Sequence, residues 1–322
     1  MPIRPPISLI KIPRTALVVM AVAAAATLAG CAKASDTAGP AGAPGSSGGT
    51  VKVVAGFYPF AFLAERIGGA HVTVDNLTKP GAEPHDLELT PSQVGAVATA
   101  DLAIHEKSLQ PNVDSAIAQN KPKHTLDVAT VIRLEDHGDL GEGGASGGSH
   151  SADPHIWLDP VDFRKVSTAV SDALQQADPA HAADYQANAA ALDSQLTALD
   201  AEYRTGLAQC QRKDIVTSHA AFGYLAERYG LTQVPIAGLS PDDEPSAAHL
   251  AQIEGLIKAK GVTTVFFETL ASPKTARTLA SDTGTKAAVL DPIEGVADPS
   301  QHDYLTVMRA NLAALKSALA CS

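Results

Sequence analysis

The chain has 322 residues, which is long enough for two domains with separate hydrophobic cores. Its formal net charge of -11 at pH 7 argues against a nucleic acid as partner and is compatible with the binding of a cation. Aromatic residues make up only 4% of the chain, so Ala, Val, Leu and Ile must supply most of the core.

Residues 1–30 are predicted to form a signal peptide. Positive residues at its start are followed by a short apolar run, 16–26, and small residues precede Cys31. Small residues directly before a cysteine resemble a bacterial lipobox, which implies cleavage before Cys31 and lipidation of that residue. A plain signal peptide is the alternative; a membrane span is disfavoured because the run is shorter than about 20 residues.

Residues 31–50 are expected to be a flexible, lipidated tether. Ala, Gly, Ser and Pro dominate this stretch, and it cannot bury apolar surface. Loss of residues 1–30 would remove positive charges and no acid, so the mature chain would be more acidic still.

Strand-like and helix-like patterns alternate from residue 51 onward. The strands expected first are 51–56, 72–77, 101–104 and 124–128, and the helices are 61–67, 91–100, 113–118 and 161–176. Further along, the expected strands are 214–218, 232–236, 262–268 and 287–290, and the helices are 220–229, 247–260, 274–283 and 304–319. Such alternation predicts an α/β fold of βαβ units with parallel sheets flanked by helices. We place one lobe at 51–178 and another at 209–322.

A long helical pattern at 179–208 separates the two lobes. Its apolar positions, among them Leu192, Leu196 and Leu199, keep to one stripe. A helix of about 28 residues spans roughly 40 Å, more than a crossover within one domain needs. We therefore expect a rigid connector helix and little relative motion of the lobes.

Residues 135–153 interrupt the alternation. They combine several acids with a Gly/Ser tract and with His137 and His150. This composition predicts a mobile, acidic, histidine-containing loop.

Two cysteines follow Cys31, namely Cys210 and Cys321. In an exported protein such a pair favours a disulfide, which would join the last helix to the start of the second lobe. Two unpaired buried thiols are the alternative.

Three histidines share one kind of position, a turn or strand end beside a proline or a helix start: His85, His155 and His219. Asp291 and Glu268 stand at the carboxyl ends of expected strands, the edge at which open α/β sheets bind ligands. Imidazole with carboxylate suits a cation such as zinc, which usually takes four ligands. Spacing alone does not separate such ligands from ordinary solvated histidines.

Four segments carry a resemblance to a known family: 81–91, 153–160, 218–225 and 289–295. In this order they resemble the metal-specific solute-binding proteins of bacterial ABC importers, and the zinc (ZnuA/TroA-like) branch most of all. The resemblance covers about residues 51–320. It implies two α/β lobes joined by one long helix, with the metal buried between them.

Matched residue by residue, the resemblance implies His85, His155, His219 and Asp291 as metal ligands. Members that prefer manganese typically have a carboxylate at the third position. Histidine there favours Zn²⁺, because neutral nitrogen donors suit it better than the harder Mn²⁺. Glu268 is expected to orient a histidine ring, with a solvent-facing or helix-capping carboxylate as the alternative.

Zinc-specific members often carry a His-rich loop where 135–153 lies. The loop is short here, so a zinc-gathering role for His137 and His150 competes with a plain disordered insertion.

The resemblance implies a non-catalytic monomer that captures Zn²⁺ and delivers it to an ABC permease. It would be anchored through Cys31 at the outer face of the bacterial cytoplasmic membrane. One alternative is a secreted zinc hydrolase with Glu268 or Glu83 as base, which would need an open coordination position. A manganese-binding transport component and an adhesin are further alternatives.

Overall fold

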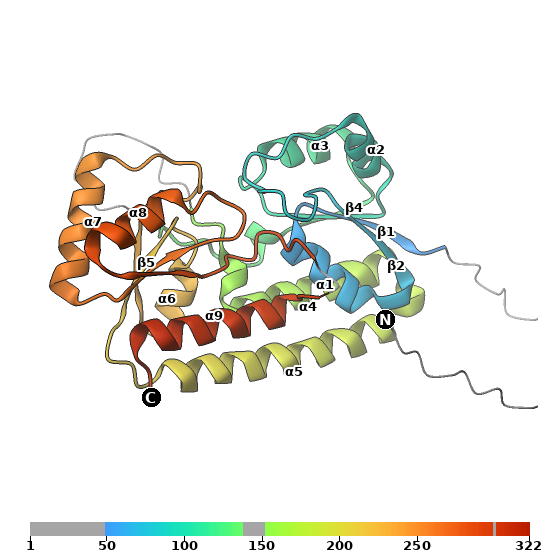
Figure 1. The fold of residues 1–322 in the computed structure, drawn as a ribbon. Coiled ribbons are helices and arrows are strands. Elements are labelled where there is room, and N and C mark those ends of the chain that lie inside the picture. The colour runs from blue at the N-terminus through green and yellow to red at the C-terminus, as the bar shows by residue number, and fades with distance from the viewer. Residues whose placement is uncertain (1–48, 138–151, 299–300) are drawn as a thin grey trace, which may run out of the picture. The chain divides into compact units, whose positions relative to one another are not determined.

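The computed structural model describes residues 49–137, 152–298 and 301–322 (Figure 1). The expected signal peptide, the lipidation site Cys31 and nearly all of the tether lie outside these residues, as does His150 with the rest of 138–151. Within the described ranges, no helix has both the length and the apolar character that a membrane span requires.

Two four-stranded parallel sheets form the centres of two lobes. The first sheet has the order β2-β1-β3-β4 and contains β1 (Val51–Ala55), β2 (Val72–Asn76), β3 (Leu102–His105) and β4 (His124–Asp127). The second has the order β6-β5-β7-β8 and contains β5 (Asp214–Thr217), β6 (Thr232–Pro235), β7 (Thr264–Phe267) and β8 (Lys286–Val289). The predicted α/β class, with a parallel sheet in each lobe, is confirmed. In each sheet the strand order proceeds to one side of the first strand and then switches to its other side, between β1 and β3 and between β5 and β7. Such a switch point opens a crevice at the carboxyl ends of the strands.

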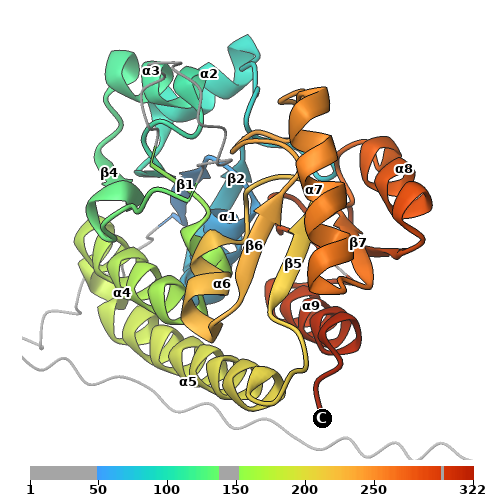
Figure 2. The same ribbon diagram turned by 90° about the vertical axis from the view of Figure 1, so that its left-hand side faces the viewer.

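Helices flank both sheets (Figures 1 and 2). The first lobe has α1 (Tyr58–Gly68), α2 (Pro91–Thr99), α3 (Pro111–Asn120) and α4 (Pro160–Ala177), with 3₁₀ turns η1 (Gly69–His71), η2 (Val128–Thr130) and η3 (Ile156–Leu158). The second has α6 (Gly223–Tyr229), α7 (Ala247–Lys260), α8 (Lys274–Thr283) and α9 (Tyr304–Leu319). As expected, α2 starts from Thr90 and Pro91. Thr90 and Gln93 cap each other's backbone N–H groups, which satisfies donors that the first turn leaves free.

The long connector is α5 (Ala182–Leu207), which follows the 3₁₀ turn η4 (Pro179–His181). Its 26 residues correspond to about 39 Å at 1.5 Å per residue. Helix α9 runs beside it (Figure 1), and the Tyr203 hydroxyl donates to the Met308 carbonyl at 2.7 Å. Helix α9 starts among aromatic rings of the first lobe, where the Tyr304 ring lies 4.5 Å from that of Phe163. Two adjacent helices, and not α5 alone, therefore span the lobes.

One cluster of buried apolar side chains contains residues of both lobes. Phe57 and Trp157 belong to the first lobe, Leu225 and Phe266 to the second, and Leu196 of α5 lies among them. Separate smaller clusters pack under α2 and α3 and under α7 and α8. A large apolar contact between the lobes opposes their relative motion.

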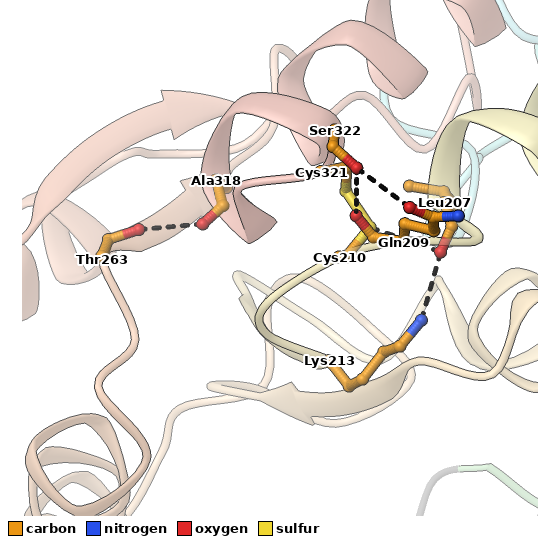
Figure 3. Close-up of a disulfide and its surroundings, with 8 residues drawn as sticks. All are labelled: Leu207, Gln209, Cys210, Lys213, Thr263, Ala318, Cys321 and Ser322. Atoms are coloured by element: carbon orange, nitrogen blue, oxygen red, sulfur yellow. Dashed lines mark hydrogen bonds between the residues drawn. A yellow bond between two sulfur atoms is a disulfide. The ribbon is translucent and has the colours of Figure 1, made fainter.

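The predicted disulfide between Cys210 and Cys321 is present (Figure 3). It joins the chain just after α5 to the end of the chain after α9. Beside it, the Lys213 ammonium donates to the Leu207 carbonyl at 3.1 Å, and the Thr263 hydroxyl donates to the Ala318 carbonyl at 2.9 Å. The last helix is thus tied to the start of the second lobe.

Candidate metal centre

Four side chains from separate loops converge between the lobes. His85 lies in the loop after β2, His155 just before η3, His219 after β5 and Glu294 after β8. One ligand atom from each lies within 4.8 Å of the others, and the described residues contain no second group of this kind. Both sheets thus direct their carboxyl-end loops at one point.

The contacts centre on one carboxylate oxygen. Oε1 of Glu294 lies 3.1 Å from Nε2 of His219, 3.2 Å from Nε2 of His155 and 3.4 Å from Nε2 of His85. His155, His219 and Glu294 are no more than 1% exposed, whereas the side chain of His85 is 11% exposed. His85 also lines a cavity of about 520 Å³ together with Lys107, Leu109, Pro154, Ser240 and Asp243. The centre is closed except on the side of His85.

The loop that carries His85 is fixed from both sides. The carboxylate of Glu83 accepts a hydrogen bond from the backbone N–H of His85 at 2.9 Å. The buried amide of Gln110, just before α3, donates to the Pro84 carbonyl and to the Thr78 hydroxyl. These contacts hold a segment that its prolines already stiffen.

Buried carboxylates orient the other two rings. Nδ1–H of His155 donates to Oδ1 of Asp153 at 2.7 Å, and Nδ1–H of His219 donates to Oε1 of Glu268 at 2.9 Å. Because a carboxylate only accepts, the proton of each ring is held at Nδ1 and Nε2 faces the centre. The Ser218 hydroxyl also donates to Oε1 of Glu268, at 2.7 Å.

Charge and burial have opposite effects on the pKa values of His219 and Glu294 at this centre. Burial disfavours the protonated His219, but Glu294 and Glu268 outweigh burial and raise its pKa to about 10. Burial also opposes ionisation of Glu294, but the three histidines hold the pKa of that carboxyl well below its ordinary value. The group therefore favours an anionic Glu294 beside a protonated imidazole, and a divalent cation would replace that proton.

The donor set fits a four-coordinate cation. Three imidazole nitrogens and one carboxylate oxygen are ligands typical of Zn²⁺. The second oxygen of Glu294, Oε2, is buried and has no hydrogen-bond partner among the described residues. A cation at the centre would satisfy this oxygen or its neighbour Oε1.

The structure does not bring Asp291 to the three histidines; the carboxylate that meets them is Glu294. Asp291 shapes the turn before it. Its carboxylate accepts from the Thr269 hydroxyl and from the backbone N–H of Ile293, both at 2.8 Å, and Asn311 pairs with its backbone. The Asp291 carboxylate is thus hydrogen-bonded within its own turn, and this is why it does not join the histidines as expected.

The backbone reverses at Ile293, immediately before Glu294. Ile293 is fully buried and has φ of 57°, a left-handed conformation that is rare for a β-branched residue. The indole N–H of Trp157 donates to the Pro292 carbonyl at 2.7 Å and holds this turn from the first lobe. Such strain costs about 1–3 kcal/mol and persists only where surrounding contacts impose it.

Two further residues predicted from the sequence, Glu268 and His137, lie beside the ligand group and not in it. Glu268 lies against the ring of His219, whereas His137 lies outside the ligand group and contacts Asp153. Sequence reasoning named neither Glu294 nor Asp153. Asp153 stands two residues before a histidine in an Asp-Pro-His triplet, and this spacing was the available indication of a carboxylate beside the ring.

The family model described as "Zinc-uptake complex component A periplasmic" matches residues 53–318. The high-affinity zinc uptake system protein ZnuA of Bacillus subtilis is 36% identical over 291 residues, which are 85% of this chain and 89% of that protein. The zinc-binding lipoprotein AdcA of Streptococcus pneumoniae serotype 4 is 36% identical over 279 residues, which are 83% of this chain but 56% of that protein.

Two solved structures extend this comparison. The Zn(II)-bound ZnuA-like domain of Streptococcus pneumoniae AdcA has a TM-score of 0.71 and 35% identity, covering 84% of this chain and 99% of that one. The laminin-binding protein Lmb of Streptococcus agalactiae, described as having adhesin and metal transporting activity, has a TM-score of 0.75 and 31% identity with the same coverage. The chain thus spans nearly the whole of these two structures and about half the length of full AdcA.

Proposed function

The chain belongs to the family of zinc-uptake complex component A, and on this basis we propose that it binds Zn²⁺ between its lobes and delivers it to an ABC-transporter permease. The proposed ligands are Nε2 of His85, His155 and His219 and the carboxylate of Glu294. The observation that carries the proposal is this convergence of four buried or half-buried donors from four loops of both lobes. Asp291 is replaced in the ligand set by Glu294.

Several features favour a carrier over a hydrolase. Four protein ligands leave a tetrahedral zinc ion without an open position for a reactive water. The two candidate bases are engaged elsewhere: Glu268 holds the ring of His219, and Glu83 accepts from the backbone of His85. ZnuA of Bacillus subtilis and AdcA of Streptococcus pneumoniae are named as zinc-uptake and zinc-binding proteins. We propose that this chain is not an enzyme.

The proposed location is the outer face of the cytoplasmic membrane. Residues 1–30 would direct export, and lipidated Cys31 with the tether to residue 50 would hold the chain there as a monomer. Support comes from the lipobox-like sequence, from the family description as periplasmic and from the lipoprotein AdcA of Streptococcus pneumoniae. The proposed division of the exported chain remains 51–178, connector 179–208 and 209–322.

The test is zinc titration by calorimetry on the mature chain, made with Cys31→Ser so that it stays soluble. We expect one zinc ion per wild-type chain. His219→Ala should weaken binding by more than tenfold, because it removes a ligand together with the ring that Glu268 orients. Zinc binding that survives this change unaltered would move the site elsewhere.

A matched pair of variants tests the carboxylate ligand. Glu294→Gln should weaken zinc binding by at least 10–100-fold, because the anionic ligand is lost. Asp291→Asn keeps a side chain of the same size at the turn and should have a smaller effect on affinity. The reverse order in competition titrations would restore Asp291 as the ligand.

A further inference from the structure

His137 stands at the start of the segment that the sequence suggested as a zinc-gathering loop, yet its ring is engaged. Nδ1 lies 2.8 Å from Oδ2 of Asp153, and Nε2 lies 3.3 Å from Oε2 of Glu227. The ring stands nearly perpendicular to that of Tyr224, with 4.6 Å between the ring centroids, and only 19% of the His137 side chain is exposed. Both nitrogens face carboxylates, so the ring has no nitrogen directed at a solvent cation.

Asp153 links His137 to the metal centre. This carboxylate is fully buried, and its two oxygens have different partners. Oδ1 accepts from the backbone N–H of His155 at 2.9 Å and from Nδ1–H of the same residue at 2.7 Å. Oδ2 accepts from His137. The hydrogen bond of His137 therefore fixes the plane of the carboxylate that orients a proposed ligand.

Helix α6 of the second lobe provides the space for this ring. Gly223 begins the helix, and a Cβ atom placed there would lie 2.4 Å from both Cβ and Cγ of His137. Only glycine leaves room for the imidazole where it lies. The next residue, Tyr224, accepts from the backbone N–H of Glu135 at 2.8 Å and donates to the Asp153 carbonyl at 2.9 Å.

Helix α6 also comes shortly after His219, another proposed ligand, in the sequence. It begins four residues after His219, so α6 connects His219 directly to the residues that support His155. The backbone N–H of Asp153 also donates to the Glu135 carbonyl at 2.7 Å, which closes the base of the segment. His137, Asp153, Gly223 and Tyr224 form one connected group, which we call the inter-lobe latch.

We infer that His137 is a positioning residue of the metal centre, which holds Asp153 against His155 and is itself held in place by Gly223 and Tyr224 of the second lobe. The inference rests on the proposed function, and it replaces a gathering role for His137 with a structural one. The pKa of His137 is raised, chiefly by its hydrogen bond to Asp153, as expected of a ring whose two N–H groups donate to carboxylates.

Two variants that act on the same contact test this inference. His137→Ala removes the ring, and Gly223→Ala forces it from its place. Loss of a group that orients a ligand typically weakens metal affinity 10–100-fold, so each should weaken zinc binding about tenfold. The double variant should be no weaker than either single variant, because both remove one interaction. His137→Gln, whose amide can donate to Asp153, should recover most of the affinity.

Gly255→Ala in α7 is the matched control. A Cβ at Gly255 would meet no atom within 4 Å, so the same chemical change should leave zinc binding unaltered. Thermal unfolding of each variant shows whether it folds.

Kinetics separate positioning from gathering. In stopped-flow measurements with a zinc-sensitive chelator, the positioning role predicts faster zinc release from His137→Ala with an unchanged association rate. Slower association with unchanged release would show that His137 collects zinc, and equal rates would show that the latch does not act on the centre. Either result would overturn the inference. The proposed function would still stand in both cases, provided that the wild type binds zinc.

A second readout needs no bound metal. Imidazole ¹⁵N spectra should show Nδ1 of His155 protonated in the wild type and a changed Nδ1 signal in His137→Ala and Gly223→Ala. Were the wild type to bind no zinc, the proposed function would fail, yet these spectra would still test the contact. Unchanged spectra in both variants would overturn the inference.

Discussion

The ring of His219 lies between two buried carboxylates, Glu268 at Nδ1 and Glu294 at Nε2. Their charges raise its pKa to about 10 against the opposing effect of burial. At neutral pH the ring therefore holds a proton that a metal ion must displace. Proton release makes the apparent affinity of such a site depend on pH.

We accordingly expect zinc affinity to rise about tenfold for each unit of pH in the neutral range, since one proton leaves for each ion bound. The dependence should steepen in acid as His155 takes up a proton, since Asp153 raises its pKa against the opposing effect of burial. Competition titrations in buffers between about pH 6 and pH 8 measure the slope. An affinity that does not change with pH would mean that His219 is already neutral before the metal binds.

Glu106, immediately after β3, is a further buried carboxyl, and its charge would act on that of Asp153. Neither of its oxygens has a hydrogen-bond partner among the described residues, and burial raises its pKa well above the ordinary value, with Asp153 and Asp127 adding to the effect. The folded protein therefore keeps Glu106 neutral at a pH at which the unfolded chain ionises it.

An acid with a raised pKa in the folded state supports folding at low pH, and that support is lost as pH rises toward the folded pKa. The loss amounts to about 1.4 kcal/mol per pH unit over that window. Glu106→Gln should remove the slope, so its unfolding free energy relative to wild type should increase with pH. Urea unfolding at several pH values measures this, and parallel curves for the two proteins would contradict it.

Among single residues, the sequence singled out the three histidines that the structure brings together, but it named Asp291 where the structure places Glu294 beside them. Each of the three histidines sits beside a proline or a helix start, a local pattern. Asp291 and Glu294 lie three residues apart in one motif, and the choice between them depends on the left-handed backbone of Ile293. That conformation is imposed by Trp157 and Asn311, which are distant in sequence, and no local pattern predicts it.

For the helices, the sequence pattern predicted the bounds correctly where the capping residues were clear. Helix α7 has the predicted bounds, with Ser246 accepting from the backbone N–H of His249 at its start and Gly261 in a left-handed conformation at its end. Helix α8 also has the predicted bounds and ends at Gly284. The position of α9 beside α5 was not predictable in this way, because it depends on tertiary contacts such as that of Tyr203 with Met308.

The disulfide acts between elements, because it joins the ends of α5 and α9. It closes a loop with a sequence separation of 111 residues. Loops of this length restrict the unfolded chain strongly, so Cys210→Ser with Cys321→Ser should lower the unfolding free energy by about 2–5 kcal/mol. Urea unfolding of the oxidised wild type and the double variant measures this. The reduced wild type should match the variant, and a variant as stable as the oxidised protein would show that the bond contributes nothing.

In the molecule as a whole, the apolar cluster shared by the two lobes is the main feature that limits their relative motion. Residues such as Trp157 and Phe266 are buried in one continuous core, and α5 and α9 both cross from lobe to lobe. An interface of this kind resembles the interior of a single domain more than a hinge.

Zinc binding should therefore change the relative position of the lobes little, with the changes concentrated in the loop around His85. Crystal structures or small-angle scattering of the protein with and without zinc would measure this. A large rotation of one lobe against the other on zinc binding would contradict the expectation.

The bond between Cys210 and Cys321 has a further consequence, because it makes the second lobe a closed covalent ring. A protease that cuts once within the ring, for example in 240–246, would release no fragment. The two pieces would separate in electrophoresis only after reduction. His219 would stay attached through the unbroken chain and Glu294 through the disulfide, so a nicked molecule would keep all four proposed ligands in one covalent assembly.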